Sequence, residues 1–450
     1  MLYAGLFIVL GALKYAVHRN LVDFGIFAQT AASAFGCFCN TIEGSHWAFH
    51  FSPILYLVGA AVAIVRSPLV LIALQSAACA LVAPPIAALV AARAGTGSAR
   101  LCALVVWLYP PLAGLAFGDF HENVFAPAAV AWMLWAFDRE YHRLVLFFAA
   151  LALAVKEDQA VFLAVAGALG AWYLRGTAMG RVALGICAAS VAVLLCFYLV
   201  IQPHASALAH WAPTRFYAWT GADARALFPD GIAQRIGFLL LAFVPLLFLP
   251  FRSRLMWLAA VPLAEVLLSR MPTAFTMGTH YAGAWIGYVL VPFAWSVRTF
   301  APQRAPRLLW VAAALCAIEC AVADPLHPGI NLRAPQARDA ALDRFLRSLP
   351  PDADVATQEE AYTHLALSDP RATLLPESAA LPLHACFVLV DGDFPASPRL
   401  QEYGTALQRL VRDRTYALTL RSGAIALYES RISSDATTRC AHWPSGLIMR

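Results

Sequence analysis

Charged residues are scarce in this chain, and their scarcity excludes most classes of soluble protein. Only 13% of the 450 residues are charged, and 61% are hydrophobic. Soluble domains are roughly a quarter charged and about half apolar. The mean hydropathy is +0.66. We therefore expect a polytopic membrane protein, with helical spans, because a helix satisfies its own backbone hydrogen bonds in lipid.

Several chemical motifs are missing as well. The sequence has no Cys-x-x-Cys pair, no zinc-ligand spacing and no glycine-rich nucleotide fingerprint. Its net charge of +5 comes from basic residues scattered over short loops, so we expect no nucleic-acid partner.

Cys386 and Cys440 lie in the polar C-terminal region and would pair if that region is extracytoplasmic. Other cysteines lie in apolar segments and would be small core residues: Cys79, Cys102, Cys187, Cys196, Cys316 and Cys320.

Apolar windows of helical length predict about eleven transmembrane helices. They cover residues 2–17, 69–92, 101–117, 123–137, 144–155, 160–174, 182–201, 237–250, 255–270, 283–297 and 308–323. The first window has no cleavage site after it, which predicts a retained first span or a start codon placed slightly late. Segment 50–65 is short and begins with His50 and Pro53, so we expect an interfacial or re-entrant helix there.

The arginine-rich short loops fall on one side of this topology, which places that side and the N-terminus in the cytoplasm. The expected location is the bacterial cytoplasmic membrane. The opposite, extracytoplasmic side then carries loops 18–68, 118–122, 156–159, 202–236 and 271–282 and everything after residue 324. The unusual acids and histidines gather on that side. The positive-inside rule does not explain this, whereas a functional site does.

The composition changes near residue 324, where apolar windows end. This predicts two domains, a transmembrane domain over 1–323 and an extracytoplasmic α/β domain over 324–450. In the second, the patterns predict helices at 336–348 and 398–413 and strands at 354–357 and 384–391. Residues 416–421 and 424–429 predict a hairpin that turns at Ser422-Gly423.

Two short loops hold the most distinctive ionisable residues. Ionisable groups at membrane depth are costly and mark functional sites by default. If the first loop is helical, Asp119 and Glu122 stand on one face and offer two oxygen ligands, so they are candidate ligands for a divalent cation, Mg²⁺ or Mn²⁺. Other candidates for the same side are His121 in the first loop, Lys156, Glu157 and Asp158 in the second, and His50, His280 and Tyr281 elsewhere.

Motifs along the chain resemble a bacterial family of predicted membrane proteins, catalogued as domain of unknown function 2079. They are Val22–Gln29 (VDFGIFAQ), His50–Leu55 (HFSPIL), Gln75, Tyr109-Pro110, Asp119–Glu122, Lys156–Asp158, His280-Tyr281, Leu349–Ala356 and His364-Leu365. The resemblance covers about residues 21–430. The chain departs from the family pattern at Val22 and Ala28, and the second acid of the first motif is missing.

This family looks like a branch of the GT-C superfamily of membrane glycosyltransferases, which use polyprenyl-phosphate-linked sugars. The resemblance implies a GT-C-like fold and a catalytic acid just after the first span, where Asp23 stands. Independently of the resemblance, sugar transfer needs a base for the acceptor hydroxyl and positive charge for the leaving phosphate. Asp23 or Glu122 would supply the base, while Lys156, His121, His280 or a cation would face the phosphate.

Ordinary structural roles compete with each of these assignments. Asp23 would serve as a helix cap, and Asp119–Glu122 as a polar loop. Lys156–Asp158 would fix a tight helical hairpin through an internal ion pair. His50 and His280 would be satisfied interfacial histidines.

The leading hypothesis is an extracytoplasmic glycosyltransferase acting on a lipid, glycan or protein acceptor. One alternative is a transporter or flippase of a lipid-linked or anionic solute, although neither internal repeats nor midplane polar groups are evident. Another is a non-catalytic envelope protein.

Overall fold

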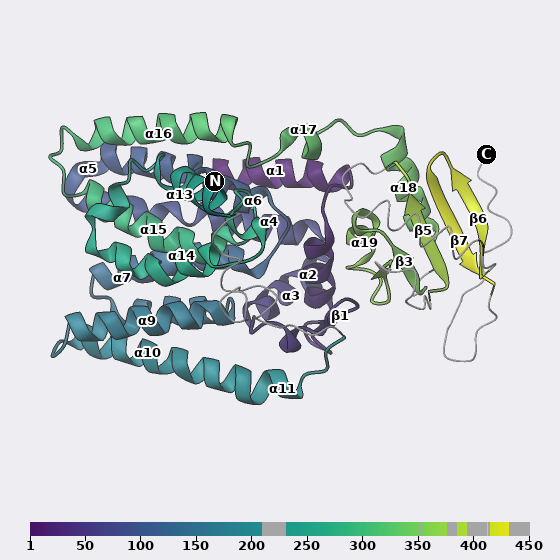
Figure 1. The fold of residues 1–450 in the computed structure, drawn as a ribbon, viewed down its shortest axis with the longest axis horizontal. Helices are drawn as coiled ribbons and strands as arrows, with labels where there is room; N and C mark the ends of the chain where they lie inside the picture. Colours follow the sequence, from purple (N-terminus) through teal and green to yellow (C-terminus); the bar gives the residue numbers. More distant parts are fainter. Residues whose placement is uncertain (209–230, 351–352, 376–384, 394–411, 413–414, 432–450) are drawn as a thin grey trace. The chain divides into compact units, whose positions relative to one another are not determined.

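The computed structural model describes residues 1–208, 231–350, 353–375, 385–393, 412 and 415–431. The chain forms two compact units (Figure 1). The first contains Met1–Val9, Trp47–Val58 and Leu71–His327, and the second contains Leu10–His46, Gly59–Val70 and Pro328–Arg450. The second unit thus combines the C-terminal region with two segments from the first seventy residues. A domain boundary between residues 323 and 324 stays a prediction.

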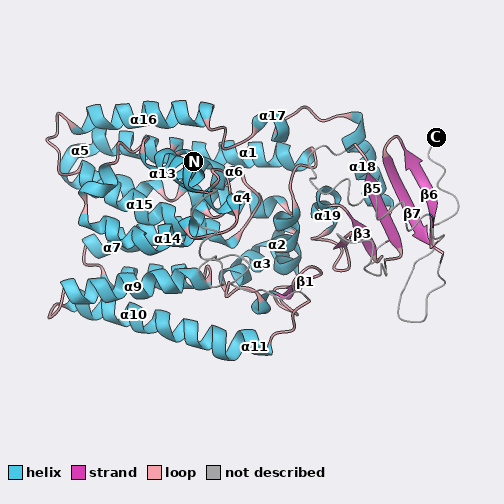
Figure 2. Cartoon of the chain, in the orientation of Figure 1, coloured by secondary structure: helices cyan, strands magenta, loops and turns pink. Residues whose placement is uncertain are grey.

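The first unit is a helical bundle (Figure 2). Its described helices include α4 (Leu69–Ala80), α5 (Ala83–Leu108), α6 (Pro110–Phe117), α7 (Ala126–Asp138), α8 (His142–Leu153), α9 (Glu157–Tyr173), α10 (Ala178–Cys196), α13 (Ile232–Phe243), α14 (Ala260–Leu267), α15 (Ala282–Val297) and α16 (Ala305–Val322). The helices α1 (Leu2–Ala16), α3 (Ile54–Val65) and α4 contribute residues to both units. Each predicted span coincides with helical structure, although several boundaries differ.

Proline and glycine determine where the helices of this unit break. Gly95 inside α5 has φ +80° and ψ 169°, so the backbone leaves helical geometry within the predicted 93–100 connection. Tyr109 is extended, as expected before a proline. Pro110 and Pro111 then begin α6, where their missing N–H groups cost nothing. This sequence of breaks brings the end of α6 to the Gly118–Glu122 loop.

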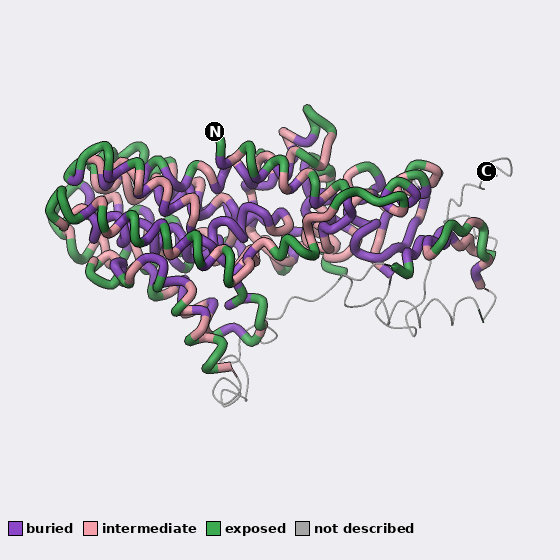
Figure 3. Tube along the Cα trace, turned by 90° about the horizontal axis from the view of Figure 1, so that it is seen from above, coloured by how far each residue is buried: buried purple, intermediate pink, exposed green. Residues whose placement is uncertain are grey.

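Helix α15 forms the buried centre of the first unit. All of its residues except Trp295 are buried, and it packs against α5, α6 and α7. Helices α9 and α10 lie side by side. Buried and exposed stretches alternate along most other helices, as Figure 3 shows. A helix exposed along its length with apolar residues, such as α10, is suited to face lipid.

Three helical segments in the described part of the chain are long and apolar enough to cross a membrane: Leu69–Leu108, Ala178–His204 and Ala305–Val322. Shorter apolar helices are Leu2–Ala16, Ile54–Val65, His142–Leu153, Ile232–Phe243 and Ala282–Val297. The expected count of about eleven spans stays a prediction, as does the interfacial or re-entrant placement of α3.

The second unit contains a mixed five-stranded sheet in the order β4-β3-β5-β7-β6. Its strands are β3 (Val355–Thr357), β4 (Thr373–Leu374), β5 (Phe387–Asp391), β6 (Tyr416–Ser422) and β7 (Ile425–Ser430). Strand β3 is parallel to β4 and β5, while β7 is antiparallel to β5 and β6. The predicted strands, the hairpin and the helix over 336–348, observed as α18 (Ala337–Ser348), are confirmed. The helix predicted over 398–413 lies outside the described residues apart from Arg412.

The segment after the first span is helical, whereas the sequence predicted a loop. Helix α2 (Val22–Ala32) packs against α19 (Glu359–Leu365) within the second unit. Gln29 joins them: its amide donates to the backbone oxygens of Asp369 at 3.2 Å and Ala372 at 2.9 Å. Its oxygen accepts from Thr41 N at 2.9 Å and the Tyr362 hydroxyl at 2.9 Å. This motif residue therefore has a structural role.

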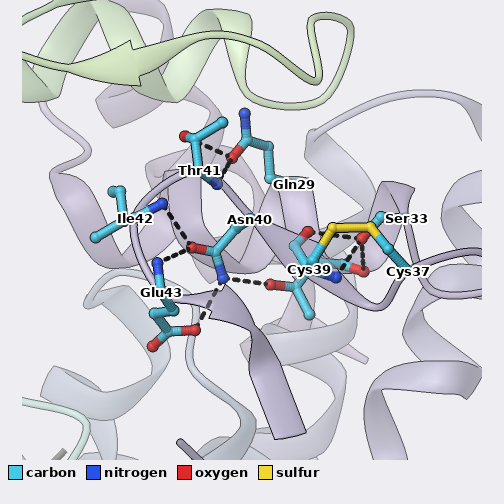
Figure 4. The surroundings of a disulfide bond; sticks show 9 residues. Gln29, Ser33, Cys37, Cys39, Asn40, Thr41, Ile42 and Glu43 are labelled. Carbon is cyan, nitrogen blue, oxygen red and sulfur yellow. Dashed lines mark hydrogen bonds between the residues drawn. A yellow bond between two sulfur atoms is a disulfide. The ribbon is translucent and has the colours of Figure 1, made fainter. Parts of the chain in front are cut away.

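A disulfide joins Cys37 and Cys39 just after α2 (Figure 4). The hydroxyl of Ser33 donates to the backbone oxygen of Cys39 at 2.7 Å and accepts from its N–H at 2.9 Å. Cys386 is also disulfide-bonded. Cys440 lies outside the described residues, so its pairing with Cys386 stays a prediction.

The six cysteines expected in the core differ in burial. Cys79, Cys102 and Cys316 are buried, and Cys187 and Cys320 are half-buried. Cys196 is exposed, so the expectation that it is a core residue is wrong. Its position near the end of α10, on a helix with little buried surface, explains the difference.

Candidate functional site

The first unit brings most of the predicted site residues together. They come from the loop before α3, the loop after α6, the start of α9 and the loop before α15. Ion-pair contacts, ring stacking and mutual electrostatic effects connect them. We call this group the Lys156 cluster: Lys156, His50, His121, Glu122, Glu157, Asp158, Glu265 and His280.

Glu157 anchors the loop before α3 to the start of α9. Its Oε1 lies 2.8 Å from Nδ1 of His50, and its Oε2 accepts from the N–H of Phe51 at 2.9 Å. Burial opposes the charge of Glu157, but His50, Lys156 and the Phe51 N–H outweigh burial and lower its pKa. Its place in the first helical turn also favours negative charge. Glu157 therefore has a clear positioning role.

Glu122 and two histidines form the second part of the cluster. The imidazole of His121 contacts Glu122, with Nδ1 and Oε2 2.9 Å apart. The ring of His280 stacks on that of His121, with centroids 3.9 Å apart and planes 8° apart. Burial lowers the pKa of both histidines, which favours the neutral form of each ring. Each neutral ring retains a nitrogen that can accept a proton or a metal ion.

Glycines and one glutamine place this part of the cluster. A Cβ on Gly114 would overlap Gly278, and a Cβ on Gly283 would overlap Asn123. These glycines allow the segment carrying His280 to approach α6 and η2 (Glu122–Phe125). Gln75 in α4 donates to the backbone oxygens of Ala116 at 3.2 Å and Gly118 at 2.9 Å. It thereby holds the end of α6, immediately before the Asp119–Glu122 loop.

Lys156 is the cationic centre of the cluster. Burial disfavours its charge, but Asp158, Glu122, Glu157 and Glu265 outweigh burial and raise its pKa. Its Nζ lies 4.0 Å from Oδ2 of Asp158. The lysine is therefore charged at neutral pH and surrounded by acids. The predicted internal ion pair and the predicted site are both compatible with this arrangement.

Asp158 differs from the other acids of the cluster. Burial, opposed by Lys156 and reinforced by Glu157 and Glu122, raises its pKa to about 6. Glu122 behaves oppositely: burial would raise its pKa, but His121, Lys156 and His50 together lower it. A carboxyl that titrates near neutral pH is suited to proton transfer, and a permanently ionised one to binding a cation.

Three predicted site residues are not members of the Lys156 cluster. Asp119 and Tyr281 adjoin it in sequence and are half-buried; the ring of Tyr281 lies 4.1 Å from that of His280. Asp23 belongs to the second unit, where it occupies the first turn of α2. Because Leu21 is the N-cap residue of α2, Asp23 is not the cap that the competing interpretation required.

Two residues that the sequence did not select act on the cluster. Glu265 of α14 contributes to the electrostatic field at Lys156. Tyr198 interacts electrostatically with Glu157 and Asp158. It lies in the π-helical turn η3 (Phe197–Ile201), and such turns are frequent at functional sites. Sequence periodicity alone does not reveal a π-helical turn.

The charges of the cluster favour a cation. Glu122, Glu157 and Glu265 surround one lysine, and Asp158 adds a further acid above pH 6. Glu122 is fully buried; its Oε2 contacts His121, and within the described residues its Oε1 has no hydrogen-bond partner. A buried carboxylate with an unused oxygen is suited to coordinate a hard cation. The assignment of Asp119 and Glu122 as metal ligands stays a prediction.

A family model described as "Predicted membrane protein (DUF2079)" matches residues 17–402. The chain belongs to this family. The resemblance indicated by the sequence motifs is thereby confirmed. No curated protein matches this chain.

Two solved structures share the fold of this family member. ArnT from Cupriavidus metallidurans bound to undecaprenyl phosphate has a TM-score of 0.57 at 11% sequence identity, over 95% of this chain and 98% of that one. ArnT from the same organism in the apo state has a TM-score of 0.51 at 12% identity, over 94% and 97%. The likeness at this identity shows that the chain shares this fold.

Proposed function

We propose that this member of the DUF2079 family is an integral membrane glycosyltransferase of GT-C type. It transfers a sugar from a polyprenyl-phosphate-linked donor to an envelope acceptor at the extracytoplasmic face. The observation that carries the proposal is the buried Lys156 cluster, which sets a charged lysine beside carboxylates with different proton affinities. Similarity in fold to ArnT, which was solved with undecaprenyl phosphate, supports this class of donor.

In the proposed reaction, the acceptor hydroxyl attacks the anomeric carbon of the sugar. The bond from that carbon to the phosphate oxygen breaks, and polyprenyl phosphate leaves. Lys156, with His121 and His280 beside Glu122, would bind the phosphate through charge and hydrogen bonds. A carboxylate would take the hydroxyl proton; Glu122 is the proposed base within the cluster, and Asp23 is the alternative base that the family resemblance implies. Asp158, with its pKa of about 6, is suited to exchange a proton with the substrate.

A divalent cation, Mg²⁺ or Mn²⁺, fits this proposal. The acids around Lys156 would repel a negatively charged phosphate. A bound cation would offset this negative charge. Oε1 of Glu122, together with Asp119, would supply hard ligands for the ion. When bound, the ion would neutralise charge on the phosphate.

The proposed side of the membrane is supported by the disulfides. Cys37 is bonded to Cys39, and Cys386 is disulfide-bonded. Disulfides persist in oxidising compartments and are rare in the cytosol. These cysteines belong to the second unit, so this unit would be extracytoplasmic and the N-terminus cytoplasmic, in the bacterial cytoplasmic membrane.

The test uses full-length protein in lipid nanodiscs supplied with polyprenyl-phosphate sugars and extracted envelope acceptors. Release of polyprenyl phosphate is followed by mass spectrometry. Lys156→Met should lower the rate by a factor of about 10² or more, since it removes the charge facing the leaving group. Asp23→Asn and Glu122→Gln test the proposed bases. Glu140→Gln, at an exposed position after α7, is the matched control and should leave the rate unchanged.

A transporter predicts a different result in the same material. Movement of a labelled lipid-linked phosphate across proteoliposomes, without any release of polyprenyl phosphate, would overturn the transferase proposal. Equal release by wild type and Lys156→Met would remove the cluster from the mechanism. The concentration of titratable groups in one buried cluster favours the enzyme.

A further inference from the structure

A second group of chemically reactive side chains lies in the second unit. His18 follows α1, Asp343 belongs to α18 and His364 belongs to α19. One ligand atom from each of these residues lies within 4.8 Å of the others. Nε2 of His18 is already 3.1 Å from Oδ1 of Asp343. Three segments far apart in the chain therefore present two imidazoles and a carboxylate to one point.

One nitrogen of His364 is engaged in a hydrogen bond. Its Nε2 donates to the backbone oxygen of Tyr15 at 3.1 Å. This hydrogen bond fixes the tautomer and leaves Nδ1 as a lone-pair donor. Metal-binding histidines commonly use their other N–H in this way, because the bond to a carbonyl holds the ring and increases its basicity. The ring is held further by stacking on Tyr15, at a centroid distance of 4.0 Å.

A second acid, Asp339, lies near the other nitrogen of the His18 ring. Oδ1 of Asp339 lies 3.9 Å from Nδ1 of His18, on the side opposite the Asp343 contact. Arg333 holds Asp339 through two hydrogen bonds of 2.6 Å, and the Asp339 carboxylate neutralises the guanidinium. Asp339 thus places a negative charge near Nδ1 of His18, at a distance too long for a hydrogen bond, while Nε2 contacts Asp343.

The backbone of His18 is unusual as well. It has φ +56°, in the left-handed region that non-glycine residues rarely adopt, and its side chain is fully buried. Such strain persists where the surrounding structure demands it, often at ligand clamps. The side chain of Asp343 is 40% exposed, so an ion can reach the group from solvent.

We propose that His18, Asp343 and His364 bind a divalent transition-metal ion, with zinc as the ion that this ligand set suits best. Two imidazoles and one carboxylate are typical zinc ligands, with bonds of about 2.0–2.2 Å and a fourth position for water. Ligand atoms of a tetrahedral ion lie roughly 3.4 Å apart, so the widest separation here closes by about 1.4 Å on binding. The rings of His18 and His364 stack, with centroids 4.1 Å apart, so binding also turns these rings until a nitrogen of each points to the ion. The ion would fasten the end of α1 to α18 and α19 within the second unit.

This site is separate from the proposed transferase chemistry, and its test does not depend on activity. Full-length protein in detergent is stripped with a chelator, incubated with zinc and desalted, and its metal is measured by mass spectrometry. Wild type should retain about one zinc per chain at this site. Asp343→Asn and His364→Ala should lose it, whereas His327→Ala, which alters an exposed histidine paired with Asp324, should retain it. Size-exclusion chromatography confirms that each variant is folded.

Cobalt(II) provides a second measurement on the same preparations. A cobalt ion bound by two imidazoles and a carboxylate has visible absorption that Asp343→Asn should weaken or shift. Zinc retained equally by Asp343→Asn, His364→Ala and wild type would overturn the proposal, as would no zinc retained by wild type. Zinc lost only in Glu122→Gln or His280→Ala would also overturn it, since the ion would then belong to the Lys156 cluster.

Discussion

The imidazole of His50 lies 2.8 Å from the carboxylate of Glu157, although 107 residues separate them in the chain. The same carboxylate accepts the N–H of Phe51. This pair therefore holds the start of α3 against the start of α9 and adjoins Lys156. The side chains of His50 and Glu157 are 16% and 7% exposed, so the contact is largely protected from water.

The His50–Glu157 contact should contribute measurably to stability. In a double-mutant cycle with His50→Ala and Glu157→Gln, we expect a coupling free energy of about 1.5–3 kcal/mol, the range for hydrogen bonds to charged groups. Chemical unfolding in detergent measures it. His204→Ala, at the exposed end of α11 (Gln202–His204), serves as control. The pKa of Glu157 is lowered on folding, so its contribution is present above the unfolded value near 4.3 and is lost as pH falls below it. Additive effects would contradict the coupling.

Asp158 should give the proposed transferase an acidic limb in its pH profile. Its folded pKa is about 6, above the unfolded value near 3.9. If the ionised form takes a proton during turnover, the rate rises as pH passes 6. Asp158→Asn should remove this limb and lower the maximal rate by a factor of about 10². The effect of Asp158 on stability has the opposite sign to that of Glu157. The folded state binds the proton of Asp158 more tightly than the unfolded state, so stability decreases as the pH rises from about 4 to about 6. An unchanged pH profile in Asp158→Asn would refute the role.

Gly25 should be intolerant of even a methyl group. A Cβ there would overlap the ring of Tyr362, which is fully buried. Gly25→Ala should therefore lower the free energy of unfolding by about 1–3 kcal/mol. Gly36→Ala is the control, because its added Cβ would meet only ordinary contact with Ser33 O at 3.6 Å. Combining Gly25→Ala with Tyr362→Leu should recover part of the loss. Equal stability of the two alanine variants would contradict the close approach.

Thiol labelling should distinguish the disulfide-bonded cysteines from the free ones. Maleimide applied to denatured protein without a reductant should leave Cys37, Cys39 and Cys386 unlabelled, and reduction should make them reactive. Cys196, which is free and exposed, should be labelled before and after reduction. Peptide mass spectrometry identifies each site. Labelling of Cys37 and Cys39 without reduction would contradict the disulfide and weaken the argument for an extracytoplasmic second unit.

The sequence predicted local elements well where periodicity alone decides them. The apolar windows located the helices, and the pattern around Ser422-Gly423 located the hairpin. It missed α2, because the motif Val22–Gln29 was interpreted as part of a polar loop. Burial of Phe24, Phe27 and Ala28 makes that segment helical, and their partners are distant in the chain. The exposure of Cys196 was missed for the same reason.

Composition and motifs by themselves determined that this is a polytopic membrane protein of the DUF2079 family and which ionisable residues are unusual. Only the tertiary structure decided which of these residues lie together in a candidate site and which have structural roles. Lys156 and its acids share one cluster in the first unit, Gln29 is a structural hub, and His18 meets Asp343 and His364 in the second. Hydropathy and spacing follow from local chemistry, which any short window reveals. Proton affinity, ion pairing and ligand geometry depend on burial and on residues hundreds of positions away, and the folded chain alone brings these together.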